Sequence, residues 1–361
     1  MKPEARRSAT AQAGSITDVA GIRVGHYQRM GRGWQTGTTA VIIPDGAVPG
    51  VDVRGGGPGT RETDALAPQN LIEYVHGVCL TGGSAYGLAA ADGVMAWLEE
   101  HNLGFPIGLG PGKRGVVPVV PAAVVFDLGR GGTFANRPNA EFGRRAARAA
   151  RAVQPLWGSV GAGTGAKAGG LQGGVGTSSR VVSIPQQDGV PDLDVVVGAL
   201  AVVNANGSAI DPAAGLPWEP DGFRLRRPSA AERRSLLDVV EGQTNPRLNT
   251  TIGVVATSAQ LTKAEVSKLA SVAHDGLARA IRPAHSMFDG DTIFGLATGT
   301  DLLTSESTTL RIAGSRNGAL NQLLTAAAET FSAACTHAVL AATTIGEFIA
   351  YSDLCPSAFR D

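Results

Sequence analysis

Cysteine is scarce in this 361-residue sequence, which contains only Cys79, Cys335 and Cys355. The three lie far apart, none belongs to a CxxC pair, and no histidine stands at metal-ligand spacing from them. A disulfide framework and a structural zinc site are therefore both disfavoured. A reducing, cytoplasmic compartment fits this use of cysteine.

The chain also lacks an excess of charge, because 31 Lys and Arg residues are matched by 31 Asp and Glu residues. Without a net field the protein has no electrostatic attraction for nucleic acid or for an acidic membrane surface. Long hydrophobic runs are missing too, since the longest clean one, Val195–Val203, is far too short to cross a bilayer. We therefore expect a soluble protein with no nucleic-acid partner and no membrane segment.

Common nucleotide-binding and catalytic motifs are absent as well. The stretch Gly161–Lys167 is rich in glycine, yet Ala168 stands where a phosphate-binding loop needs Ser or Thr. No G-x-S-x-G elbow is present, which disfavours a conventional serine hydrolase. Asp289 and Asp291 lack the further oxygen ligands and the terminal Glu of a calcium-binding EF-hand loop.

What the sequence does contain is a composition typical of a buried core, with 43% hydrophobic residues, and 49 glycines grouped in clusters. Residues 1–15 are expected to form a flexible tail ahead of a single domain over residues 16–361. Helices and strands alternate, which predicts an α/β or α+β fold with helices packed on sheets. Helices are predicted at Ala89–Glu100, Ala264–Ile281, Asn317–Ala341 and Thr344–Tyr351, and strands at Gly37–Ile43, Asp194–Val203, Thr250–Thr257 and Met287–Phe294.

The most informative segment begins at Asn249, where Thr250 and Thr251 open an apolar, β-branched run. Such a run also forms an ordinary strand, and that simpler interpretation requires no chemistry. If the chain is cut before Thr250, however, that residue carries a free α-amine beside its hydroxyl. An α-amine has a pKa of about 8 and can accept the hydroxyl proton. One residue would then supply both the nucleophile and the base.

Polar side chains that could assist such a nucleophile stand elsewhere in the sequence. Asp289 and Asp291 project from one face if their segment is extended, and two neighbouring carboxylates repel, which raises the pKa of one of them. Apolar flanks predict that this pair is buried. Asn204 and Asn206 close a predicted strand, where an amide either forms a turn or donates to an oxyanion.

Five motifs in a fixed order identify a family. They span the chain from about Thr17 to the C-terminus, and with them the sequence resembles the DmpA-type L-aminopeptidase/D-esterase and β-peptidyl aminopeptidase family, which includes the nylon-oligomer (6-aminohexanoate-oligomer) hydrolases. The motifs are Thr17–His26, Arg54–Thr63, Leu80–Leu88, Gly173–Arg180 and Asn249–Thr257.

The resemblance implies an α+β fold, an α-β-β-α sandwich of the N-terminal-nucleophile (Ntn) type, made as one precursor that cuts itself into two chains. The cut that matches the family motif lies between Asn249 and Thr250, which gives an α-subunit of residues 16–249 and a β-subunit of residues 250–361. The resemblance also implies a homotetramer of cleaved heterodimers that acts on a small peptide or amide substrate without cofactor or metal.

Carried over residue by residue, the resemblance implies that Thr250 is the nucleophile both in self-cleavage and in substrate hydrolysis. It implies that Asn206 contributes to the oxyanion hole, and that Asp289 and Asp291 hydrogen-bond the nucleophile and its amine. Lys167 would be the active-site lysine of the nylon-oligomer hydrolases. The residues implied to contact substrate are Tyr86, Phe126 and Thr251.

Three departures from the aminopeptidase members favour the nylon-hydrolase branch. Those members carry Ser in place of Thr250, Ser and Glu in place of Asp289 and Asp291, and Tyr in place of Phe126. The predicted function is a self-cleaving amide hydrolase of the aminopeptidase, amidase or esterase type that works through an acyl-enzyme. The alternatives are a Thr-dependent N-acyltransferase that resembles ornithine acetyltransferase, and an uncleaved small-molecule-binding protein.

Overall fold

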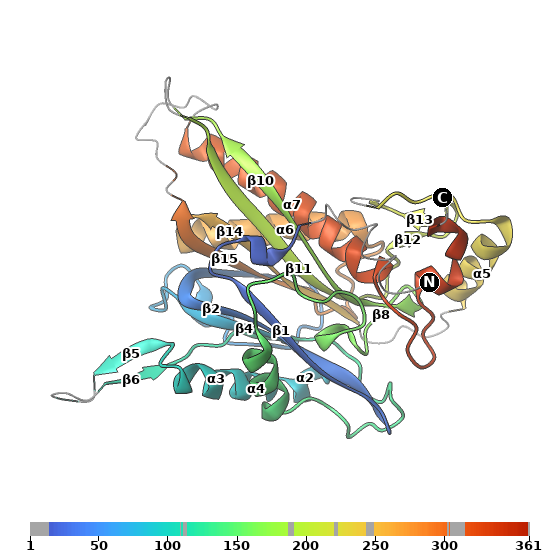
Figure 1. The fold of residues 1–361 in the computed structure, drawn as a ribbon, viewed down its shortest axis with the longest axis horizontal. Helices are drawn as coiled ribbons and strands as arrows, with labels where there is room; N and C mark the ends of the chain where they lie inside the picture. Colours follow the sequence, from blue (N-terminus) through green and yellow to red (C-terminus); the bar gives the residue numbers. More distant parts are fainter. Residues whose placement is uncertain are drawn as a thin grey trace.

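The computed structural model describes residues 14–359 except 109, 111–113, 187–190, 220–222, 243–248, 302 and 304–314. Two β-sheets are stacked face to face, and a pair of helices covers the outer face of each sheet (Figure 1). This arrangement confirms the α-β-β-α sandwich that the resemblance implies. Residues 1–13 of the expected tail lie outside the described residues, whereas Ser15 is buried and caps the short helix η1 (Ile16–Asp18).

One long strand belongs to both sheets. The first half of β2 (Trp34–Val53) pairs with β1 and β4, and its second half pairs with β15, after a break in register between Ile42 and Ala47. Around it, the first sheet has the order β1, β2, β4, β7, β3. Its other strands are β1 (Arg23–Gly31), β4 (Val75–Thr81), β7 (Ala122–Val124) and β3 (Thr60–Arg61).

The second sheet places β14 (Thr250–Ala259) at its centre, antiparallel to β11 (Leu193–Asn204) and parallel to β15 (Thr292–Asp301). Its edge strand is β10 (Gly174–Ile184). Because the other sheet covers one face of β14 and helices cover its other face, every residue of β14 is buried. The prediction of a strand at Met287–Phe294 is wrong in its first half, where the chain makes a turn before β15 begins.

The period-two alternation of side chains along β14 decides where Thr250 points. Ile252 and Val254 lie in the core between the sheets, together with Val202 of β11. Val255 lies in the other core, between the second sheet and its helices. The Thr250 side chain therefore faces the space between the two sheets, and the Thr251 side chain faces the helices.

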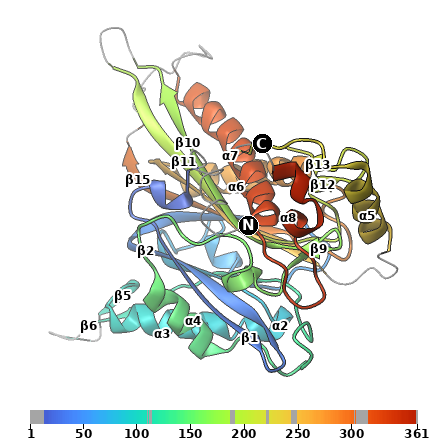
Figure 2. The ribbon, with the colours of Figure 1, turned by 45° about the vertical axis from the view of Figure 1, so that its right-hand side comes forward.

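Helices α6 (Lys263–Ala280) and α7 (Arg316–Leu340) cover the second sheet, and α3 (Ala90–Glu100) and α4 (Ala140–Ala149) cover the first, an arrangement that Figure 2 shows from a second direction. Among the described residues, α7 is the one helix apolar and long enough to span a membrane. However, 83% of its most apolar 18-residue window is buried inside the protein, where it packs on β10 and β11. Its position in the core accounts for its composition.

The predicted helices near residues 89, 264 and 317 are thus confirmed within a residue or two, but the one at Thr344–Tyr351 is wrong. There the chain forms turns that lead into the short helix α8 (Tyr351–Leu354), because Gly346 adopts a positive φ of 59° that ends regular structure. The remaining elements are η2 (Asp64–Leu66), α2 (Ser84–Gly87), β5 (Phe105–Gly108), β6 (Arg114–Val117), η3 (Gly161–Gly163), β8 (Lys167–Ala168), β9 (Leu171–Gln172), β12 (Ile210–Asp211), β13 (Leu216–Pro217), α5 (Ala230–Glu241), α8 (Tyr351–Leu354) and η4 (Pro356–Phe359).

Candidate active site

Thr250 opens β14 at the end of the core between the sheets, and it is 6% exposed. Its hydroxyl donates to the carbonyl oxygen of Asn249. The N–H of Gly290 lies 3.2 Å from that same carbonyl oxygen and 3.1 Å from the Thr250 hydroxyl oxygen. Asn249 is held in place on its other side, because its N–H donates to the Phe288 carbonyl at 3.0 Å. A hydroxyl, a peptide carbonyl and an N–H donor therefore meet at one buried point.

The glycine-rich loop after β2 packs its backbone directly against the backbone of the acidic segment. The Gly57 N–H donates to the Asp289 carbonyl at 2.8 Å, and a Cβ atom on Gly55 would lie only 2.3 Å from that carbonyl oxygen. A Cβ atom on Gly290 would lie 2.9 Å from the Thr250 hydroxyl oxygen. Glycine is thus required for this close approach, which holds the Gly290 N–H against the nucleophile candidate.

Asp291 accepts three N–H groups and ties the start of β14 to the turn before β15. Its Oδ1 accepts the Thr251 N–H at 2.7 Å. Its Oδ2 accepts the backbone N–H of His285 at 3.0 Å and lies 2.8 Å from Nδ1 of the same residue. His285 was not predicted as a site residue, because nothing in its sequence spacing marks it. The feature that marks it is structural: its backbone is left-handed, with a φ of 56°. In this conformation its backbone N–H and its Nδ1 both reach Asp291 Oδ2.

Replacing His285 with Ala should lower the free energy of unfolding by about 1 to 3 kcal/mol, because the buried Asp291 carboxyl group would lose one of its hydrogen bonds. Urea unfolding measures the change, with His101→Ala as control, since His101 is exposed and stacks on Trp97. An unchanged free energy of unfolding in the His285 variant would show that Asp291 does not depend on this contact.

Asp289 is the second buried carboxyl group, 3% exposed, and its Oδ2 accepts the Ser286 N–H at 3.0 Å and the Ser286 hydroxyl. Burial raises its pKa, the neighbouring Asp291 raises it further, and the Ser286 donors and the backbone N–H of Asn206 lower it. The two carboxyl groups therefore interact as the sequence predicts, although their segment is a turn rather than a strand. A carboxyl group with a raised pKa keeps its proton to a higher pH than an ordinary aspartate does.

Asn204, rather than the Asn206 side chain, stands opposite Thr250. The two residues are direct partners in the pairing of β11 with β14, so their side chains lie on one face, about 5 Å apart at Cβ. Asn204 is completely buried. Its Oδ1 accepts the Lys167 N–H at 3.0 Å and an Arg130 guanidinium N–H at 2.5 Å, while its Nδ2 has no partner among the described residues.

The structure places the other predicted residues at varying distances from this group. Lys167 is 8% exposed in β8, and its Nζ lies 5.8 Å from the centre of the Phe348 ring. Phe126 is half-buried just after β7. Tyr86 is 55% exposed on α2, and the Arg137 guanidinium stacks 3.7 Å above its ring. Of these three residues, Lys167 contacts the Asn204 side chain, through its backbone N–H.

Asp127 is a third buried carboxyl group, 3% exposed, in the loop that follows β7. Its Oδ1 accepts the Gly83 N–H at 2.6 Å. Burial raises the pKa of Asp127 from 3.8 to about 6, and the nearby Thr36 hydroxyl, Arg130 guanidinium and Gly83 N–H offset only part of that effect.

This raised pKa predicts a pH-dependent stability. Because the folded-state pKa lies above the unfolded value, the contribution of Asp127 is fully present below about pH 4 and is lost as the pH rises through about 6. A shift of about 2 pKa units corresponds to about 3 kcal/mol. The free energy of unfolding of the wild type and of Asp127→Asn can be measured in urea between about pH 4 and pH 7. The difference between the two proteins should change by about 3 kcal/mol over this pH range. A constant difference would show that the pKa of Asp127 is not raised by folding.

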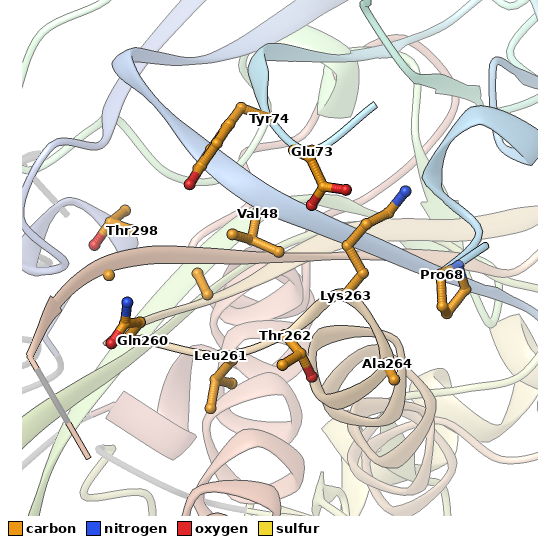
Figure 3. A pocket seen from close by; sticks show the side chains of 12 residues that line it. Val48, Pro68, Glu73, Tyr74, Gln260, Leu261, Thr262, Lys263, Ala264 and Thr298 are labelled. Atoms are coloured by element: carbon orange, nitrogen blue, oxygen red, sulfur yellow. The ribbon is translucent and has the colours of Figure 1, made fainter. Parts of the chain in front are cut away.

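A cavity of about 500 Å³ opens at the far end of β14 from Thr250. It is lined by Glu73, Tyr74, Gln260 and the start of α6, as Figure 3 shows. The 10 residues of β14, at about 3.3 Å each, put it about 30 Å from Thr250. This cavity therefore does not serve the Thr250 group. Among the described residues, no cluster of three or more His, Cys, Asp or Glu side chains could hold a metal ion.

Comparison with known families decides the classification. The family model "Peptidase family S58" matches residues 14–350. The chain belongs to peptidase family S58. As a member of this family and a relative of amide-cleaving enzymes, it is a hydrolase that acts on peptide or other amide bonds.

Individual relatives agree with the S58 assignment. An uncharacterized aminopeptidase of Mycobacterium tuberculosis (strain H37Rv) is 48% identical over 356 residues, which cover 96% of this chain and 99% of the relative. A 6-aminohexanoate-oligomer endohydrolase of a Kocuria species is 29% identical and is matched over 78% of this chain and 74% of its own length. Both branches named by the sequence resemblance are thus represented, which confirms that resemblance.

Two solved structures show the fold of this S58 member. A β-aminopeptidase from a Burkholderia species superimposes with a TM-score of 0.66 at 23% identity, covering 96% of this chain and 94% of its own. The L-aminopeptidase D-Ala-esterase/amidase of Ochrobactrum anthropi superimposes with a TM-score of 0.66 at 20% identity, covering 91% and 87%. The latter is described as a variant of the Ntn-hydrolase fold, so the present chain has that fold as well.

Proposed function

We propose that this S58 peptidase cuts itself between Asn249 and Thr250 and then uses Thr250 as an N-terminal nucleophile on linear amide substrates. The observation that carries the proposal is the meeting of the Thr250 hydroxyl with the Asn249 carbonyl under the Gly290 N–H. An ordinary strand residue is not expected to hold its hydroxyl against the preceding carbonyl while a glycine N–H contacts both oxygens.

Self-cleavage begins when the Thr250 hydroxyl oxygen attacks the Asn249 carbonyl carbon. The Gly290 N–H donates to the carbonyl oxygen as it becomes an oxyanion. The peptide C–N bond then breaks, the nitrogen takes up a proton, and an ester joins Asn249 to the Thr250 oxygen. Water hydrolyses this ester, which leaves a carboxylate on Asn249 and a free amine on Thr250. The products are chains 1–249 and 250–361.

In the mature site, the new amine accepts the Thr250 hydroxyl proton while the oxygen attacks a substrate amide or ester. The oxyanion would be held by the Gly290 N–H and the buried amide nitrogen of Asn204. That nitrogen has no hydrogen-bond partner among the described residues and Asn204 stands opposite Thr250, which supports Asn204 over Asn206 for this role. Asp291 fixes the backbone of Thr251, and the raised pKa of Asp289 suits it to exchange a proton with the amine. Water then releases the acyl group.

The substrate class follows from the relatives' names. We propose linear amides with a free amino end, such as short peptides or 6-aminohexanoate oligomers, with Lys167 close to the amide of Asn204 as one wall of the site. We also propose that the cleaved enzyme is a cytoplasmic homotetramer, as the sequence resemblance implies. Gel filtration with light scattering tests the assembly.

The test combines intact mass with substrate assays. Purified protein should show two masses that meet at Asn249/Thr250, and it should release amine from an aminoacyl-anilide or a 6-aminohexanoate oligomer in water alone. Release that requires an added amine acceptor such as ornithine would identify an acyltransferase instead. A persistently uncut chain that binds small molecules but turns none over would support the binding-protein alternative and contradict the proposal.

A further inference from the structure

Arg130 links the two sheets at the end of the core between them. It lies in the loop after β7 of the first sheet, whereas Asn204 ends β11 of the second. Its Nη1 lies 2.5 Å from Asn204 Oδ1 and also donates to the Gly165 carbonyl. The centre of the Phe348 ring lies 5.5 Å from its Cζ. The guanidinium is therefore held by polar and aromatic contacts, and it donates to Asn204, the residue that stands opposite Thr250.

These contacts determine which way the Asn204 amide points. An Asn side chain has an oxygen that accepts hydrogen bonds and a nitrogen that only donates them. Arg130 Nη1 and the Lys167 N–H are both donors, so the atom that faces them must be the oxygen. The NH2 group is consequently turned away from them, and its nitrogen is buried without a partner in the described parts of the chain. A buried donor left unpaired in the precursor is ready to receive an oxygen from a substrate.

The charge of Arg130 adds to this orientation. A charged N–H bound to the amide oxygen polarises the amide and makes its NH2 group a stronger donor. Asp127 is buried near by, and its carboxyl group interacts with the Arg130 charge. A partly buried cation is stabilised by such an opposite charge. Arg130 thus interacts electrostatically with Asp127 and donates a hydrogen bond to Asn204, the residue opposite Thr250.

We propose that Arg130 is a positioning residue that orients and polarises the Asn204 amide as an oxyanion donor, with Asp127 as its buried counter-charge. The inference rests on the proposed role of Asn204 in hydrolysis. Arg130 itself touches no substrate. In the precursor, the Gly290 N–H already lies against the Asn249 carbonyl, so loss of Arg130 should impair turnover much more than self-cleavage.

A double-mutant cycle of Arg130→Met and Asn204→Ala tests this inference on processed enzyme, with processing checked by intact mass and folding by Tm. We expect Arg130→Met to lower kcat about tenfold or more with KM nearly unchanged. The same substitution in the Asn204→Ala background should have almost no further effect, because the amide it orients is gone. Arg130→Lys keeps the charge but not the planar fork, and it should give an intermediate kcat.

The matched control is Arg29→Met, which removes a guanidinium stacked 3.8 Å above the Trp34 ring and should leave kcat unchanged. Equal losses from Arg130→Met in both backgrounds, or full activity of the single variant, would overturn the inference. Wild-type kcat in Asn204→Ala alone would instead contradict the assignment of Asn204, and with it that part of the proposed function. If Arg130→Met fails to fold, the cycle is run with Arg130→Lys, and the same pattern decides.

Discussion

Thr250→Ala should leave the protein as a single uncut chain of 361 residues and abolish amide hydrolysis, with kcat reduced at least about 10⁴-fold. Both effects have one cause, since the same hydroxyl oxygen attacks the Asn249 carbonyl and later the substrate. The substitution removes no large side chain and does not interrupt the pairing of β14, so the variant should fold. Intact mass and an amide-hydrolysis assay measure the two outcomes.

Two further variants make the Thr250 result specific. Thr250→Ser retains a hydroxyl at the same place and should still cut and still hydrolyse. Thr300→Ala is the matched control, because its hydroxyl also bonds a backbone carbonyl, that of Ser258, but at the far end of β15. A Thr250→Ala protein that still appears as two chains would show that another group, or a contaminating protease, makes the cut.

Asn204→Ala should give the second largest effect, a loss of about 10²- to 10³-fold in kcat with KM little changed, because an oxyanion donor acts in the transition state. Self-cleavage should persist in this variant, since the Gly290 N–H contacts the Asn249 carbonyl in the uncut chain. The expected product is a normally processed but nearly inactive enzyme. Kinetics on the purified two-chain protein measure the effect.

Asn204→Asp sharpens the experiment. An aspartate keeps the shape and still accepts from Arg130 and from the Lys167 N–H, but it replaces the NH2 donor with an oxygen that repels an oxyanion. It should therefore be at least as inactive as the alanine variant. Asn206→Ala serves as the comparison, because the sequence resemblance points to that position instead. A larger loss from Asn206→Ala than from Asn204→Ala would restore Asn206 as the donor.

The sequence predicts the layers and the nucleophile better than it predicts the site around them. Helix composition locates α3, α6 and α7, and the β-branched run after Asn249 locates β14. The choice between Asn204 and Asn206 needs the pairing register, because only register shows which residue stands opposite Thr250. Alternation along β11 could have suggested Asn204, since Val202 two residues earlier faces the core between the sheets.

Other site residues depend on contacts between distant segments. His285 reaches Asp291 because its own backbone takes a left-handed conformation, which the surrounding amino-acid sequence does not predict. Arg130 reaches Asn204 from the opposite sheet, across 74 positions of sequence. Asp289 and Asp291 were expected on a strand, but the loop from Arg54 to Gly57 packs against their backbone and holds them in a turn. Such features follow from tertiary packing and not from periodicity.

The central position of β14 has a consequence for the protein once it has been cut. The second chain would supply β14 and β15, which lie between β11 and β2 of the first chain. Neither chain could leave without opening the middle of a sheet, so the halves should stay together indefinitely under native conditions. After complete denaturation, however, recovery would require two separate molecules to meet, and its rate should depend on concentration. Maturation would thereby turn a unimolecular folding reaction into a bimolecular one, and dilution would slow refolding of the mature enzyme but not of Thr250→Ala.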